Sequence, residues 1–142
     1  MPVLGFNITK IEVEKELAGI PQGQVEVRVT PRVDDVRLGE IMTPNGKVNG
    51  VEIVFSFEVT YSPTIGRGLV RGMVLYLPPQ RERVDEIIDL WENEKKIDSM
   101  AFAEVVNFLM VELSPVLMVV AKEMRLPYHV ALPRVEVRGE NQ

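Results

Sequence analysis

The 142-residue chain contains no cysteine, one histidine and one tryptophan. Without cysteine there can be no disulfide, no thiol nucleophile and no cysteine-ligated zinc. The single histidine, His129, has no second histidine with which to hold a metal ion, so we expect it to be a hydrogen-bonded loop residue. The sequence therefore predicts a protein without a metal or other cofactor and without enzymatic activity.

The chain also lacks clusters of basic residues. Its net charge is -5, and acids and bases are spread along its length. A nucleic-acid surface needs clustered lysine and arginine to neutralise phosphates, so we expect no nucleic-acid partner. The N-terminus has no basic start followed by an apolar run, which predicts no signal peptide and a cytoplasmic protein.

Two groups of acids are candidates for acid-base chemistry or for holding Mg²⁺. Asp34 and Asp35 are adjacent, and adjacent residues of a strand point to opposite faces. Asp85, Glu86 and Asp89 fall on the polar side of a predicted amphipathic helix. Both groups are better explained as solvated surface than as catalytic carboxylates.

The first half of the chain alternates between apolar and polar residues, which is typical of half-buried strands. The first strand, near Phe6 to Val13, has a slip of face close to Lys10. In the second, Pro31 should end or bend the strand unless it lies at a sheet edge. The four predicted strands cover residues 6–13, 25–30, 51–59 and 68–77.

Turn residues separate these strands, at 18–23, at 43–46 and at 62–66. The links leave no room for helical crossovers before residue 78. Sequential strands with short links favour an antiparallel meander.

The spacing of the apolar residues changes after Pro78 and Pro79. Val84, Ile87, Ile88 and Trp91 recur at helical spacing with charged residues between them, which predicts an amphipathic helix over 81–96. Trp91 is a candidate anchor for a partner, although such a residue more often closes the core. Asp98 and Ser99 then offer an N-cap for a second helix.

That second helix is apolar on nearly every side from Met100 to Met124. Glu104, Asn107, Glu112 and Pro115 interrupt it, so we expect a buried helix rather than a membrane span. Ser114-Pro115 is either a cap with a first-turn proline or a kink. One sheet can cover only one side of such a helix, so its other side needs the 81–96 helix, a second copy of the chain, or a ligand.

The chain opens with the amphipathic strand Phe6-Asn7-Ile8-Thr9-Lys10-Ile11-Glu12-Val13. Near its end, Asn107 lies in the apolar helix, Pro127 follows that helix and Pro133 lies in an extended stretch. In these residues, and in its order of strands, helix and extended tail, the chain resembles the SecB family of protein-export chaperones, with which the spacing of the last three residues agrees without a gap. The extra helix near 81–96 has no counterpart in the family. The family also has a cysteine-containing tail that binds zinc and contacts the export motor, and no residues of this sequence match that tail.

The resemblance implies a chaperone that binds unfolded polypeptides without ATP, as a dimer or a tetramer of its own chain, in apolar grooves. The methionines of the long helix suit such an adaptable surface, although each alone is more simply a core residue. The residues expected to bind a peptide or partner are Tyr128, Val130, Leu132 and Trp91. Those expected to pack a second copy or another element against the helix are Phe102, Val106, Phe108, Leu109 and Leu113.

We therefore expect one α+β domain, with a four-stranded antiparallel meander sheet packed on two to three C-terminal helices. The sheet should occupy residues 1–77, the helical layer 78–127, and an extended tail 128–142. The predicted function is binding of apolar, unfolded polypeptide by a homo-oligomer, with no membrane insertion. The alternative is a non-catalytic subunit that docks one specific protein through its apolar helix.

Overall fold

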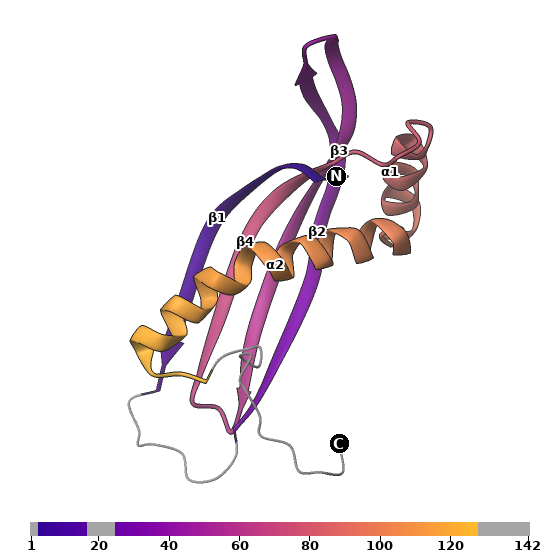
Figure 1. Cartoon of the computed structure of the whole chain (residues 1–142). Coiled ribbons are helices and arrows are strands. Elements are labelled where there is room, and N and C mark those ends of the chain that lie inside the picture. The colour runs from indigo at the N-terminus through magenta and orange to yellow at the C-terminus, as the bar shows by residue number, and fades with distance from the viewer. Residues whose placement is uncertain (1–2, 17–24, 128–142) are drawn as a thin grey trace, which may run out of the picture.

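The structure, a computed structural model, describes residues 3–16 and 25–127. Four strands come first: β1 (Val3–Lys15), β2 (Glu26–Thr43), β3 (Gly46–Ser62) and β4 (Gly66–Tyr76). Two helices follow, α1 (Arg83–Glu94) and α2 (Ser99–Met124). The predicted α+β class, the four antiparallel strands and the helical layer are all confirmed (Figure 1).

The predicted meander is wrong at one point. The spatial order of the strands is β1-β4-β3-β2, so β1 lies beside β4 and at the opposite edge of the sheet from β2 (Figure 1). Tight turns make neighbours of β2, β3 and β4. The link between β1 and β2 is longer: residues 16–25 of an extended chain can reach about 30 Å, while three strand intervals span about 14 Å. A link of that length does not force its two strands to pair.

The edge position of β2 explains why it continues through Pro31. Pro31 lies opposite Phe57 of β3, and its missing N–H falls on a strand with no further neighbour among the described residues. A register shift between Val33 and Asp35 further along also bends this edge. In β1 a second shift between Ile8 and Lys10 confirms the predicted slip of face.

Helix α1 confirms the amphipathic segment predicted over 81–96. Its buried residues are Val84 and Ile87, and it packs against β2 and β3. Asp98 caps α2, since its carboxylate accepts from the Ala101 N–H at 3.0 Å. The same carboxylate pairs with the Arg83 guanidinium at 2.5 Å, so one side chain fixes the starts of both helices.

Helix α2 crosses one face of the sheet and closes the main core (Figure 1). Its buried residues recur every fourth position: Ala101, Val105, Leu109, Leu113, Leu117 and Ala121. They face a continuous apolar layer from β3 and β4, which includes Phe55, Phe57 and Val70. Neighbours at a spacing of four lie on the same side of a helix, and the stripe winds gradually around α2 as the helix crosses the strands. These residues hold α2 on the sheet.

Neither proline of this region ends α2. The helix continues through Pro115, so the predicted cap or kink at Ser114-Pro115 lies within an unbroken helix. The end comes at Arg125, which adopts the left-handed conformation (φ 54°). The Leu126 N–H then donates to the Ala121 carbonyl at 2.8 Å, a pattern that closes many helices. Pro127 follows a helix that has already ended.

The opposite face of the sheet carries the charged residues. Ion pairs join neighbouring strands there: Arg37 with Glu52 at 3.0 Å, Arg67 with Glu12 at 3.2 Å and with Glu14 at 3.4 Å, and Arg32 with Glu58 at 3.5 Å. These pairs are typical of a solvated sheet surface.

Candidate protein-binding face of α2

The side of α2 that points away from the sheet is apolar and exposed. We call it the outer face, and it is made of Met100, Ala103, Asn107, Val111, Pro115 and Val119. Val111 is 71% exposed and Val119 is 62% exposed. Five of these six side chains are apolar, whereas a helix of a solvated monomer normally places polar residues on this side.

The flanks of the outer face widen the apolar surface. Phe102, Val106, Val116, Met118 and Val120 are half-buried along its two sides. No lysine or arginine occurs between Ser99 and Ala121. The two acids of this stretch, Glu104 and Glu112, lie on one flank. The result is a long apolar surface with a few acids at its border and no base.

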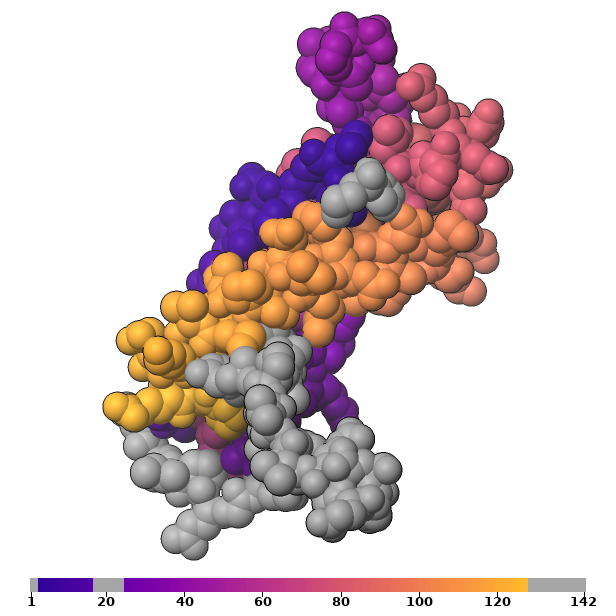
Figure 2. Space-filling model, viewed as in Figure 1, coloured from indigo at the N-terminus to yellow at the C-terminus, as the bar shows by residue number. Residues whose placement is uncertain are grey.

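No other described element covers this surface. Helix α1 packs on β2 and β3 and lies near the start of α2 rather than over it (Figure 1). Figure 2 shows the outer side of α2 lying across the front of the domain, with the β2–β3 hairpin projecting beyond the sheet at one end. The sequence left open whether the first helix covers the second, and the structure shows that it does not.

By length and composition, α2 is the one described helix that could cross a membrane. Core helices of soluble proteins pass the same test, but only 22% of its most apolar window is buried within the chain. Its inner stripe packs against the sheet, and Glu104 is hydrogen-bonded there. Those contacts favour a helix that belongs to the domain and lacks a cover on one side.

Two polar groups interrupt the outer face. Pro115 has no N–H, so it cannot donate to the Val111 carbonyl as residue 115 of a helix otherwise would. One turn before Val111, the exposed Asn107 amide makes no hydrogen bond to any described residue. The Ser114 hydroxyl, in contrast, donates to the Met110 carbonyl. The outer face thus offers an amide donor and a carbonyl that lacks its usual donor.

A hydrogen bond also joins α2 to the sheet. The Tyr76 hydroxyl, on a residue only 1% exposed, donates to a Glu104 carboxylate oxygen at 3.1 Å. Burial and, next, this bond to an acid raise the pKa of Tyr76 to about 12. This bond adds to the packing of the buried stripe of α2, which leaves Val111 and Val119 exposed.

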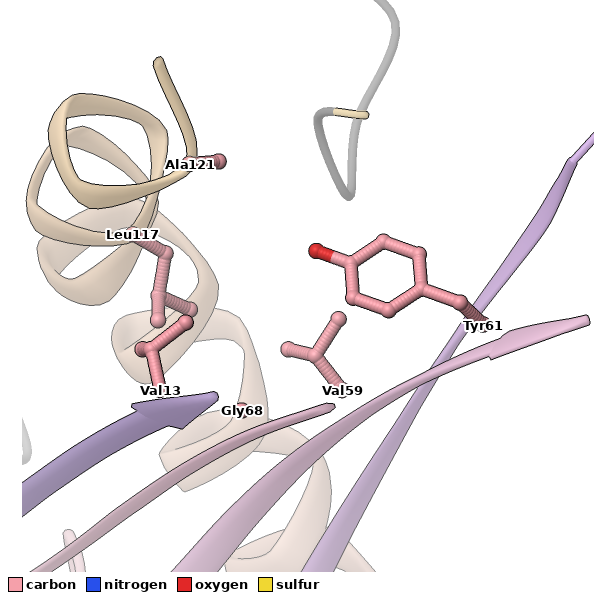
Figure 3. A pocket seen from close by; sticks show the side chains of 6 residues that line it. All are labelled: Val13, Val59, Tyr61, Gly68, Leu117 and Ala121. Carbon is pink, nitrogen blue, oxygen red and sulfur yellow. The ribbon is translucent and has the colours of Figure 1, made fainter. Parts of the chain in front are cut away.

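The small interior cavity of the domain is not a ligand site. It lies between the sheet and the C-terminal half of α2 (Figure 3). The space open there is about 10 Å³, room for one water molecule at most. Its one hydroxyl, on Tyr61, donates to the Pro127 carbonyl at 3.2 Å, and burial raises the pKa of this tyrosine. The lining residues are Val13, Val59, Tyr61, Gly68, Leu117 and Ala121.

The residues predicted to pack α2 divide into three groups. Leu109 and Leu113 are 1% and 0% exposed, so they pack inside the chain and cannot contact a second copy. Phe108 meets Phe6 of β1 edge to face, with ring centroids 5.5 Å apart. Phe102 and Val106 are half-buried beside the outer face, where a partner can reach them.

The predicted peptide-binding residues are not brought together among the described residues. Trp91 packs in part against the core, with the Lys95 ammonium 5.7 Å from its ring centroid. Tyr128, Val130 and Leu132 lie outside the described residues, as does the predicted tail 128–142. Sequence reasoning did not assign Val111, Pro115 and Val119 to a binding surface. The signal for them was the second stripe at a spacing of four, from Ala103 to Val119.

Within residues 3–16 and 25–127, no three His, Asp or Glu side chains lie close enough to hold a metal ion. Comparisons with protein-family models, with curated proteins and with solved structures find no match to this chain. The candidate site therefore rests on the geometry of α2 alone.

Proposed function

We propose that the protein binds apolar, unfolded polypeptide in the cytoplasm without ATP, in the manner of the SecB-like chaperones that its sequence resembles. One observation carries the proposal: the outer face of α2 is apolar, long, and uncovered by any described element. Exposed apolar surface of this kind marks sites of protein contact. Methionines at its start and on its flank, Met100 and Met118, can adapt to different side chains.

The size of the surface fits weak and reversible binding. From Met100 to Lys122 the helix is about 33 Å long, and with a helix width of about 12 Å the face offers about 400 Å². Burying that area is worth about 10 kcal/mol, most of which the loss of free motion on association offsets. Such a site binds many apolar segments loosely, as a chaperone without ATP requires.

The test is suppression of aggregation of an unrelated, chemically denatured protein. The wild-type chain should suppress it, and Val111→Glu with Val119→Glu should abolish the effect, because two charges would enter the apolar contact. Met42→Glu is the matched control, since Met42 is 73% exposed but lies on the distant hairpin. Equal activity in all three proteins, or none in the wild type, would rule out this function for α2.

The alternative is a non-catalytic subunit that docks one specific protein. Asn107 favours it, because a single amide within an apolar surface binds most tightly to a partner that has a hydrogen-bond acceptor at that point. A dedicated subunit would fail the aggregation assay and would not bind an apolar dye once its partner is present.

A further inference from the structure

Two Asn-Gly pairs occur in the sequence, Asn45-Gly46 and Asn49-Gly50, and both lie toward the tip of the β2–β3 hairpin. This end of the hairpin projects beyond the sheet, because β4 ends at Tyr76, opposite Val51, and residues 46–50 pair with β2 alone (Figure 1). Both asparagine side chains are exposed. The two pairs therefore share their chemistry and their contact with water, and they differ in the backbone that surrounds them.

An asparagine that precedes glycine can react with its own main chain, because no side chain shields the glycine nitrogen. At the first pair, the Gly46 nitrogen attacks Cγ of Asn45 and forms a C–N bond, and the side-chain nitrogen of Asn45 leaves as ammonia with the proton of the attacking nitrogen. The resulting succinimide ring then takes up water at one of its two carbonyls. Opening at one carbonyl gives aspartate, and opening at the other gives isoaspartate, in which the main chain runs through the former side chain.

Asn45 lies in the turn itself. The turn Thr43-Pro44-Asn45-Gly46 closes the hairpin, and Gly46 has a φ of +113°, a conformation that favours glycine. No atom lies within 4 Å of the point that a Cβ on Gly46 would occupy, so the surroundings leave room for the ring. Gly46 also belongs to the last pair of the ladder, opposite Thr43, and the end of a ladder opens at the least cost. Ring closure at Asn45 therefore requires the opening of that pair alone.

Asn49 has the same neighbour but a backbone that is held in place. Gly50 is buried and pairs with Gly39, four positions further along β3 than Gly46. A Cβ on Gly50 would lie 2.6 Å from Cδ1 of Ile41 and 3.2 Å from the Tyr76 carbonyl oxygen, so the backbone there is tightly surrounded. Ring closure at Asn49 would require the ladder to open well inside the hairpin. The structure thus separates two chemically equal pairs.

We propose that Asn45 is a modification site of this protein, at which the main chain converts the side-chain amide to isoaspartate and aspartate with water as the only reagent, while Asn49 stays intact. This modification is independent of the proposed function, because it concerns the hairpin and not α2. The product adds a negative charge two residues before Lys47, which pairs with Glu40 at 3.6 Å. As isoaspartate it also lengthens the main chain of the turn, which weakens the closing pair of the ladder.

The Thr43 hydroxyl controls how readily the turn opens. It donates to the Gly46 carbonyl at 2.7 Å and accepts from the Asn45 N–H at 3.3 Å. These bonds hold the two residues whose main chain must rotate for the ring to close. Thr43→Val keeps the shape of the side chain and removes both bonds, so conversion of Asn45 should become about threefold faster, with no change at Asn49. An unchanged rate at Asn45 in this variant would refute the control by Thr43.

The test follows the two amides in the full-length, folded chain by peptide mass mapping. The protein is incubated at mildly alkaline pH, where the attacking nitrogen loses its proton more readily, and samples are digested with trypsin. Cleavage after Lys47 places the two asparagines on separate peptides, 38–47 and 48–67. Asn45 should gain the mass of the change from amide to acid more than about tenfold faster than Asn49. An isoaspartate-specific methyltransferase should then label the peptide 38–47 alone.

The same incubation in urea separates the effect of the structure from that of the dipeptide. In the unfolded chain the two asparagines should react at rates within about twofold of each other, because both precede glycine and no ladder remains. Asn45→Gln is the matched variant, and it should leave the peptide 38–47 unmodified because its longer side chain must close a larger ring. An intact Asn45 in the folded chain under conditions where the unfolded chain reacts would overturn the assignment. Equal rates at Asn45 and Asn49 in the folded chain would overturn it as well.

Discussion

The domain has two outward surfaces, and they differ in chemistry. On the sheet, the surface that faces away from the core contains ion pairs between strands, such as Arg37 with Glu52 and Arg67 with Glu12. On α2, the surface that faces away from the core presents Val111, Pro115 and Val119 and no base. Both border solvent in the single chain, so solubility alone explains the first and not the second.

The two surfaces also differ in how their side chains are paired. Side chains of the sheet's outer surface complete one another across strands, as in Arg32 with Glu58. Those of the outer face of α2 have no such neighbours within the described chain. This difference is the basis of the proposal that the outer face of α2 binds another polypeptide.

The largest expected effect separates the two sides of α2 itself. Leu113→Ala should lower the free energy of unfolding by about 3 kcal/mol, because it opens a cavity against the sheet. Val111→Ala should change it by less than about 0.5 kcal/mol in dilute protein. Urea denaturation measures both. A large loss in Val111→Ala would mean that the outer face is already covered within the chain.

A smaller effect on the free energy of unfolding is expected at the hydrogen bond between Tyr76 and Glu104. Tyr76→Phe should cost about 1–2 kcal/mol near neutral pH, because Glu104 loses its donor. Folding raises the pKa of Tyr76 from near 10 to about 12, so the folded state favours the protonated hydroxyl. This contribution is complete below pH 10 and is lost as the pH rises toward 12.

The check on Tyr76 is the difference in unfolding free energy between wild type and Tyr76→Phe at several pH values. The difference should shrink between pH 10 and 12. A constant difference across that range would show that the tyrosine is not linked to folding through its ionisation.

The smallest effect should come from the outer surface of the sheet. Arg67→Gln removes contacts to Glu12 and Glu14, yet Arg67 and Glu14 are well exposed to water and Glu12 is partly exposed. We expect a loss below about 0.5 kcal/mol that disappears in high salt. Thermal unfolding at two salt concentrations measures it. A loss as large as that of Tyr76→Phe would erase the contrast between the two surfaces.

Local patterns were enough to place most elements. Alternation predicted the strands, and helical spacing predicted both helices and the Asp98 cap. The slip near Lys10 was also visible, because the apolar residues of β1 change parity there. These features depend on the chain within a few residues of each position, which is what periodicity records.

Long-range placement could not be predicted in the same way. The position of β1 beside β4 depends on pairing between residues more than fifty positions apart, such as Glu12 and Leu69. The alternation of apolar residues in β1 does not indicate which strand it pairs with. The binding surface was likewise only half predicted. Phe102 and Val106 were selected with Leu109 and Leu113, because a helix apolar on all sides gives no sign of which side meets the sheet.

The residues between Met100 and Met124 are enough to show that α2 has more apolar surface than one sheet can cover. Which of those residues stay exposed depends on how the helix packs on the sheet. The buried stripe from Ala101 to Ala121 packs on the sheet, with the Tyr76–Glu104 bond and the Phe108–Phe6 contact beside it. In that orientation Asn107, Val111 and Val119 are exposed.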